Sequence, residues 1–352
     1  MIENPLQPKR GRGAISNPSG RFEPSRREYE YDEDAPAQVP TQFFPDRSKK
    51  IISTNDSPDV GFTHSLNPYR GCEHGCVYCF ARPTHEYLGL SSGLDFETKI
   101  FVKYDAPALL RAELTRKSWQ PQVVVMSGVT DCYQPFERDF QITRRCLEVF
   151  AEFKNPIAII TKGHLVTRDI DILARMAEWH GAQVNMSITT LDAKLARALE
   201  PRAATPSRRI EAVRLLSDAG IPVNVMVAPI IPGLTDDEIP AILEAAAYAG
   251  ARDARHVLLR LPYNLKEHFE QWLTEHAPLR KQKVLNKLRE MRGGKLYDAT
   301  YGQRMRGQGE YYDTLATMFD LYRKKYHLTG IRPPLSIEHF KVPSDQLSLL
   351  DL

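Results

Sequence analysis

Short β-rich runs and helical patterns alternate six times between about residue 62 and residue 262, and this alternation restricts the chain to few folds. The strand candidates are Phe62–Asn67, Val123–Val129, Ile157–Thr161, Gln183–Thr189, Val223–Ile230 and His256–Leu261. Several are continuous apolar runs, which is typical of parallel strands buried on both faces. Helical periodicity fills the intervals, for example at Val166, Ile170, Leu173 and Ala177. We therefore expect an α/β fold, a partial (β/α)6 TIM-like barrel, with its active site at the carboxyl ends of the strands.

The barrel is predicted over residues 51–262, between segments of different composition. Residues 1–50 are rich in Pro, Arg, Glu and Asp and poor in aliphatic residues. This composition predicts a mostly disordered N-terminal arm that is ordered only near the core. Residues 263–332 are predicted to form a helical, basic C-terminal extension, and residues 333–352 are predicted to form a flexible tail. The helices expected in the extension are Leu265–Glu275, Pro278–Met291 and Tyr311–Tyr326.

Composition excludes several classes of protein. The 352 residues are 42% apolar, enough for a sizeable core, yet no apolar run reaches the roughly 18 residues of a membrane span. The N-terminus has neither the basic start nor the apolar stretch of a secretory signal, so we expect a cytoplasmic protein without membrane contact. Five cysteines, three of them close together, favour metal binding in a reducing compartment over disulfides.

Three cysteines share one short loop directly after the first strand candidate. Cys72, Cys76 and Cys79 have the spacing C-x3-C-x2-C. A cubane iron–sulfur cluster is normally held by four thiolates, so three leave one iron open to an outside ligand. The alternative is a structural zinc site that these cysteines form with His74, although the gap from Cys72 to His74 is short for a zinc knuckle.

The cysteine motif, with Tyr78 immediately before the third cysteine, resembles the signature of the radical S-adenosylmethionine (SAM) superfamily. The resemblance implies a [4Fe-4S] cluster whose open iron binds the amino and carboxylate groups of SAM. It also implies reductive cleavage of SAM to a 5′-deoxyadenosyl radical that abstracts hydrogen from a substrate. A reductant such as flavodoxin or ferredoxin is then an expected partner.

Four later blocks resemble the spore photoproduct lyase branch of this superfamily, over roughly residues 60 to 262. They are Thr161-Lys162, Ser187-Ile188, Leu199-Glu200-Pro201 and Val227-Ala228-Pro229-Ile230. The resemblance implies that Lys162 and Ser187 meet the SAM carboxylate. It implies that Thr130 and Asp131 meet the amino group and that Tyr78 packs near the adenine. Phe80, Glu200 and Arg202 are further candidate contacts, and a local ion pair is the alternative for Glu200 and Arg202.

The part of the site that handles the product differs from the lyase. Gly128 stands where the lyase has a cysteine that returns hydrogen to the product, and Phe80 stands where it has a tyrosine. Repair of spore photoproduct is therefore not expected. Cys132 and Tyr133 form a candidate re-positioned hydrogen-donor pair, with a buried structural cysteine as the alternative.

Residues 280–306 contain nine basic residues against two acidic ones, interleaved with two tyrosines. This pattern predicts a phosphate-binding surface for a nucleic acid, with a solvated helix face as the alternative. The basic residues are Arg280, Lys281, Lys283, Lys287, Arg289, Arg292, Lys295, Arg304 and Arg306.

The chain ends in Gln346-Leu347-Ser348-Leu349-Leu350 followed by two further residues. This string resembles the short peptides that dock into the bacterial sliding clamp, and a frayed amphipathic tail is the alternative.

The sequence thus predicts a radical SAM enzyme with an unassigned substrate, with a nucleic acid favoured in a reaction resembling DNA repair. One alternative is a radical SAM enzyme that acts on a protein or a small molecule. The other is a non-catalytic, zinc-containing nucleic-acid-binding module.

Overall fold

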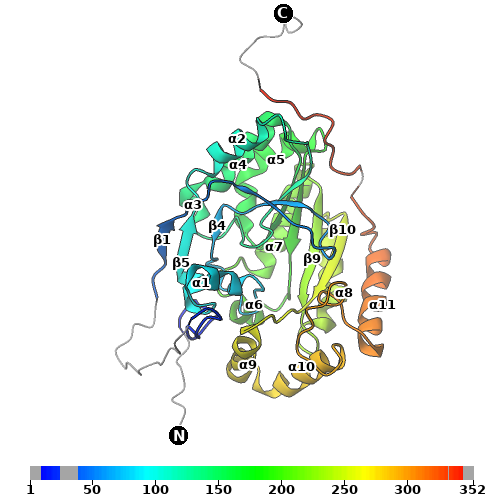
Figure 1. Cartoon of the computed structure of the whole chain (residues 1–352). Helices are drawn as coiled ribbons and strands as arrows, with labels where there is room; N and C mark the ends of the chain where they lie inside the picture. The colour runs from blue at the N-terminus through cyan, green and yellow to red at the C-terminus, as the bar shows by residue number, and fades with distance from the viewer. Residues whose placement is uncertain (1–8, 24–38, 332, 344–352) are drawn as a thin grey trace, which may run out of the picture.

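A seven-stranded sheet forms the centre of the chain in the computed structural model, which describes residues 9–23, 39–331 and 333–343 (Figure 1). Strand β2 (Ile52–Thr54) pairs antiparallel with β3, so β2 and β10 form the two edges of the sheet. Six parallel strands in sequence order confirm the predicted partial (β/α)6 barrel. In sheet order they are β3 (His64–Leu66), β6 (Val124–Met126), β7 (Ile157–Thr161), β8 (Ala182–Ser187), β9 (Val223–Ile230) and β10 (Asp253–Leu258).

The predicted strand boundaries hold best in the middle of the sheet. β7 and β9 begin and end where the apolar runs do. β10 begins three residues before the predicted range, at Asp253, and ends at Leu258 instead of Leu261. After β10 the chain continues beside β9, where the Leu259 amide donates to the Ile230 carbonyl (3.0 Å). The apolar residues that follow Leu258 are therefore buried, although they are not part of a strand.

Helices cover the outer side of the sheet in a continuous row. Contacts join α2 to α4, α4 to α5, α7 to α8, and α8 to α11, which lies along the outside of the barrel in Figure 1. The apolar faces of these helices and both faces of the strands form one core. The helices are α2 (Ala106–Leu114), α4 (Ile142–Phe153), α5 (Ile170–Ala177), α7 (Pro206–Asp218), α8 (Ile239–Tyr248) and α11 (Glu310–Lys325). Shorter helical pieces are η1 (Arg82–Leu88), α1 (Leu94–Thr98), α3 (Glu137–Phe140), η2 (His164–Asp169), α6 (Ala193–Leu199) and η3 (Asp236–Glu238).

A small second sheet supports the cysteine loop. In it β5 (Lys99–Val102) lies between β1 (Gln42–Pro45), to which it is parallel, and β4 (Tyr69–Arg70), to which it is antiparallel. β4 leads directly into the loop that carries the three cysteines. The sequence did not predict this sheet, because its strands have two to four residues and show little alternation.

The prediction of a mostly disordered N-terminal arm needs correction for the part of the arm that the structure describes. Ala14 and Ser16 are buried, and the Ser16 carbonyl accepts a hydrogen bond from the Leu94 amide (3.1 Å). Arg21 forms an ion pair with Glu86. Residues 9–23 and the strand β1 are therefore part of the folded domain, because their backbone groups bond to the barrel; residues 1–8 and 24–38 lie outside the described residues.

The C-terminal extension has the predicted helices, α9 (Leu265–His276), α10 (Pro278–Glu290) and α11. The prediction of a flexible tail is corrected in part. The Ser336 amide donates to the His180 carbonyl (3.0 Å), and the Lys341 amide donates to the Phe153 carbonyl (2.9 Å). The clamp-like string 346–350 lies outside the described residues.

The connection between α10 and α11 spans the open side of the barrel. The Met305 carbonyl accepts a hydrogen bond from the Leu258 amide (3.3 Å) at the end of edge strand β10. Arg304 forms an ion pair (2.5 Å) with Asp59, in the loop between β2 and β3 at the other edge. The basic stretch thus joins the two edges that the six-unit barrel leaves apart.

No helix in the described part of the chain is long and apolar enough to cross a membrane.

Candidate active site

The three cysteines lie on a loop whose backbone is fixed by neighbouring segments. The Cys72 amide donates to the Phe96 carbonyl (2.9 Å), and the Val77 amide to the Leu199 carbonyl (3.0 Å) at the end of α6. Gly75 has φ of +68°, and a Cβ there would meet a Glu97 carboxylate oxygen at 2.8 Å. Only glycine suits both the backbone conformation and the space at this turn.

The three cysteine thiols are available to bind a metal cluster. All three cysteines are free, Cys72 and Cys76 are buried, and Cys79 is partly exposed. Burial raises the pKa of the thiols of Cys72, Cys76 and Cys79, whereas an iron ligand is deprotonated by the metal itself. Among the described residues, no three Cys, His, Asp or Glu side chains converge on one ion position. In a cubane each cysteine ligand binds a different iron, so three free thiols on one loop are suited to hold three of the four irons.

A buried polar group at the ends of β7 and β8 brings Lys162, Glu200 and Tyr78 together. Glu200 is fully buried and accepts hydrogen bonds from the Tyr78 hydroxyl and from Thr189 Oγ1 (2.7 Å). Lys162 Nζ lies 3.8 Å from Glu200 Oε1 and 5.8 Å from the centroid of the Tyr78 ring. The side chain of Lys162 is 14% exposed, and its ammonium also donates to the Ala228 carbonyl (3.3 Å).

Arg209 completes this group and was missed in the sequence. It lies on α7, is fully buried, forms an ion pair with Glu200 and donates to the Ser187 carbonyl (3.1 Å). Burial would raise the pKa of Glu200, but the Arg209 and Lys162 charges outweigh it and hold the pKa at about 2. Glu200 is therefore an internal counter-ion that positions Tyr78 and Lys162. Neighbouring Arg208 is exposed, and no sequence signal separates the two arginines.

Asp131 links the cysteine loop to the end of β7. Its carboxylate accepts hydrogen bonds from Thr161 Oγ1 (2.7 Å), the Lys162 amide (2.7 Å) and the Tyr133 amide (2.9 Å). Its Oδ2 also lies 3.3 Å from Nδ1 of His74, between Cys72 and Cys76. Burial acts to raise the pKa of Asp131, and His74 and these donors hold it at about 2.

The other predicted SAM contacts lie around the same strand ends. Ser187 is buried at the end of β8, and its hydroxyl has no hydrogen-bond partner among the described residues. Thr130 is also buried, but its hydroxyl donates to the Tyr69 carbonyl (2.8 Å). The Phe80 ring is exposed, with the Arg260 guanidinium 5.1 Å from its centroid. Ser187 is therefore freer than Thr130 to meet a ligand.

The candidate hydrogen-donor pair, Cys132 and Tyr133, lies away from the surface. Both are buried in the main hydrophobic core, and the Tyr133 hydroxyl bonds to Asp169 (3.0 Å). The structural alternative for Cys132 is therefore favoured.

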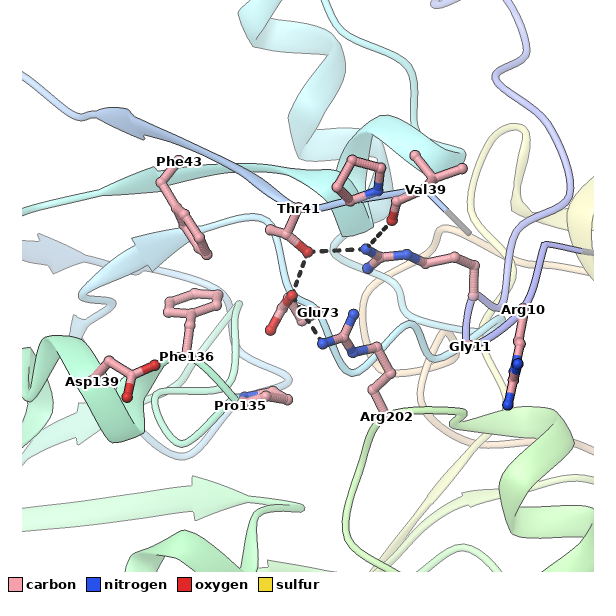
Figure 2. Close-up of a pocket in the computed structure, with 12 residues that line it drawn as sticks. Arg10, Gly11, Val39, Thr41, Phe43, Glu73, Pro135, Phe136, Asp139 and Arg202 are labelled. Carbon is pink, nitrogen blue, oxygen red and sulfur yellow. Dashed lines mark hydrogen bonds and ion pairs between the residues drawn. The ribbon is translucent and has the colours of Figure 1, made fainter. Parts of the chain in front are cut away.

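A cavity of about 690 Å³ lies beside the cysteine loop, and Figure 2 shows its lining. Glu73 is the member of the loop that lines it, where it accepts a hydrogen bond from Thr41 and pairs with Arg202 (3.3 Å). Arg202 thus forms a local ion pair, the alternative for this residue, and its partner is Glu73. The aromatic part of the lining is Phe43 and Phe136.

The basic stretch is exposed only in part. Arg292 is buried and donates to the Leu259 carbonyl (2.6 Å), and burial lowers its pKa to about 10. Arg292 therefore has a structural role, and the prediction that it contacts phosphate is corrected. Lys283, Lys295 and Arg306 are exposed.

Comparison with known proteins decides the family. The model of the Radical SAM superfamily matches residues 66–246, which contain the cysteine loop and the strand ends described above. This chain belongs to the radical SAM superfamily. The chain is also 35% identical to an uncharacterized protein of Mycobacterium tuberculosis over 248 residues, 70% of this chain and 72% of that protein.

Two further proteins are informative about the radical SAM domain. A radical SAM Nα-GlyT isomerase of Pseudomonas phage M6 is 27% identical over 196 residues, 55% of this chain and 38% of the isomerase. A structure of spore photoproduct lyase with bound AdoMet and dinucleoside spore photoproduct has a TM-score of 0.58 and 16% identity. It covers 81% of this chain and 78% of the lyase chain. At this identity the likeness to the lyase is one of fold.

Proposed function

We propose that this protein is a radical SAM enzyme that holds a [4Fe-4S] cluster with Cys72, Cys76 and Cys79. Such a cluster, when reduced, supplies the electron that cleaves SAM, and the resulting 5′-deoxyadenosyl radical abstracts hydrogen from a substrate. The observation that carries the proposal is the position of the three free cysteines on one buried loop of a radical SAM domain that also contains the partly exposed Lys162 at a strand end. A flavodoxin or ferredoxin of the cytoplasm would supply the electron.

The residues at the strand ends divide the work of holding SAM. Lys162 supplies a cation, and Ser187 a free hydroxyl, for the carboxylate. Tyr78, fixed by Glu200 and Thr189, presents its ring beside the same space. Asp131 orients the loop through His74 and carries a negative charge for the SAM ammonium, although protein donors already occupy much of its carboxylate.

A nucleic acid is the substrate class we favour, in a reaction resembling DNA repair. Of the exposed basic residues, Lys283 lies on α10, and Lys295 and Arg306 lie on the connection that spans the open side of the barrel, where a large substrate would enter. The exposed Tyr301 ring, with Arg304 4.5 Å from its centroid, gives this connection a surface for stacking bases. The related lyase structure contains a dinucleoside, which supports the same class.

The decisive experiment is an anaerobic turnover assay that follows 5′-deoxyadenosine while single-stranded DNA, duplex DNA, RNA, proteins and cell extracts are supplied in turn. We expect a brown protein with about four irons per chain and nucleic-acid-dependent product. Single replacement of Cys72, Cys76 or Cys79 by Ala should abolish both, whereas Cys146→Ala should not. Colourless protein containing zinc would favour the binding module, and product formed only with a protein or small molecule would favour that alternative enzyme.

The sliding-clamp contact remains a separate proposal. In an extended peptide, Gln346 would hydrogen-bond to the clamp, and Leu349 and Leu350 would fill an apolar groove. A peptide of residues 343–352 tests it against purified clamp. No binding at high micromolar concentration, or equal binding after Gln346→Ala with Leu349→Ala, would reject it.

A further inference from the structure

A fully buried arginine holds the backbone of the cysteine loop. Arg82, three residues after Cys79, donates to the carbonyls of Cys76 (2.9 Å) and Gly75 (3.1 Å). The same guanidinium donates to the Gly93 carbonyl (3.1 Å) before α1. Hydrogen bonds from a charged group are the stronger ones in proteins, so Arg82 fixes the loop at its second cysteine.

Glu97 connects this arginine to the N-terminal segment. Its carboxylate lies 2.5 Å from Arg82 and accepts hydrogen bonds from the amides of Gly13 (3.0 Å) and Ala14 (2.8 Å). The Arg82 and Glu97 side chains are at most 1% exposed. A buried carboxylate is stabilised by protein hydrogen-bond donors in place of water, and losing two of them costs free energy. The amides of residues 13 and 14 are therefore needed to complete the hydrogen bonding of Glu97 in this ion pair.

The N-terminal segment also touches the loop directly. A Cβ at Gly13 would lie 1.8 Å from the Gly75 carbonyl oxygen, so the two backbones are in contact there. A Cβ at Gly93 would lie 1.9 Å from the Ser16 carbonyl oxygen, which shows the same close packing at the start of α1. No side chain fits at residue 13 against the cysteine loop, or at residue 93 against Ser16.

Arg12 anchors the segment on the other side of the loop. It is buried and donates to the Glu97 carbonyl (2.9 Å), the Val39 carbonyl (2.6 Å) and Thr41 Oγ1 (2.9 Å). Thr41 in turn donates to Glu73, next to Cys72. Residues 12–16 therefore reach the cysteine loop from both the Glu73 and the Gly75 sides.

We propose that residues 12–16 form a clasp that holds the cysteine loop in its cluster-binding conformation and slows loss of the cluster. The clasp lies outside the residues 66–246 that match the radical SAM superfamily, so it is a positioning device added to that domain. The proposal rests on the proposed function in one respect, that Cys72, Cys76 and Cys79 bind a cluster. Arg12, Arg82 and Glu97 act through the loop and do not touch the cofactor's reacting atoms.

Two matched pairs of variants test the clasp in the full-length protein. Arg12→Ala removes the anchor, and Arg10→Ala removes an exposed arginine two residues away. Gly13→Ala forces a methyl group against Gly75, and Gly61→Ala adds one where no atom lies within 4 Å. Each protein is reconstituted anaerobically, and the iron content, the cluster's half-time under a chelator and the unfolding midpoint of the metal-free form are measured.

Arg12→Ala and Gly13→Ala should lose the cluster roughly ten- to a hundredfold faster than their controls, the range expected when hydrogen bonds to a charged group are broken. The metal-free unfolding midpoint should shift much less, and Arg12→Lys should restore part of the half-time. Equal half-times for Arg12→Ala and Arg10→Ala overturn the clasp even if Gly13→Ala fails to fold. A wild-type protein that binds no iron overturns the proposed function instead, so the two failures are distinct.

Discussion

The guanidinium of Arg304 pairs with the carboxylate of Asp59 at 2.5 Å, and this pairing joins two segments that are 245 residues apart at opposite edges of the sheet. Both side chains are largely buried, and Arg304 also donates to Ser57. The pair therefore fixes the basic connection over the open side of the barrel.

Breaking this pair should loosen the connection without affecting the cysteine loop. Asp59→Ala and Arg304→Ala should each destabilise the protein by about 1–3 kcal/mol, because the remaining partner is partly buried and unpaired. The double variant should cost less than the sum of the two, and chemical denaturation of all four proteins measures this coupling. Additive losses would show that the two charges do not interact.

Lys162→Ala should weaken SAM binding by about ten- to a hundredfold, the effect of removing one charged interaction of roughly 1.5–3 kcal/mol. The cluster spectrum should stay intact, because Lys162 is not a ligand. Lys194→Ala, which removes an exposed lysine at the start of α6, is the control. Calorimetric titration of SAM into reconstituted protein measures both; unchanged affinity in Lys162→Ala would remove this residue from the site.

Glu200 should make folding sensitive to acid. Its pKa is about 2 in the folded protein against an ordinary 4.5, so the unfolded chain binds a proton first as the pH falls. The stabilisation is complete above about pH 4.5 and is lost towards pH 2, amounting to at most about 3 kcal/mol. Glu200→Gln should be less stable at pH 7, because Arg209 is left buried without a counter-ion, and its stability should fall less steeply in this window. Urea unfolding of the metal-free protein at several pH values measures both; equal slopes would contradict the role of Glu200.

The sequence predicted the parts of this site that depend on local pattern. The apolar runs located β7 and β9, and the resemblance to the lyase branch named Lys162, Ser187 and Glu200 as candidates for one site. The partners of buried charges were not predictable, because Arg209 and Arg82 look like surface arginines until the tertiary structure supplies Glu200 and Glu97. The packed N-terminal segment was missed for the same reason: its composition is polar, and backbone amides make its contacts with Glu97.

Cys132 should have a structural role. Because its thiol is buried in the core, Cys132→Ala should cost about 1 kcal/mol of stability through the small cavity it leaves. Cluster content, SAM cleavage and product should remain. Cys146→Ala, at another buried cysteine, is the matched control for stability. Loss of product with continued SAM cleavage in Cys132→Ala alone would instead restore the hydrogen-donor hypothesis.

Binding of DNA should depend on the exposed members of the basic stretch. Lys283, Lys295 and Arg306 are exposed, so reversing these three charges to Glu should weaken binding of a fluorescent single-stranded oligonucleotide. Removal of each phosphate-binding charge should reduce the slope of log K against log salt by about 0.7, hence by about 2 for all three. The same reversal at Arg116, Lys117 and Lys194, which are exposed elsewhere, changes the net charge equally and should leave the slope nearly unchanged. Anisotropy titrations at several salt concentrations measure both. Equal slopes in the two triple variants would reject the stretch as the DNA-binding surface, and salt-insensitive binding would shift the proposed substrate from nucleic acid to a protein or small molecule.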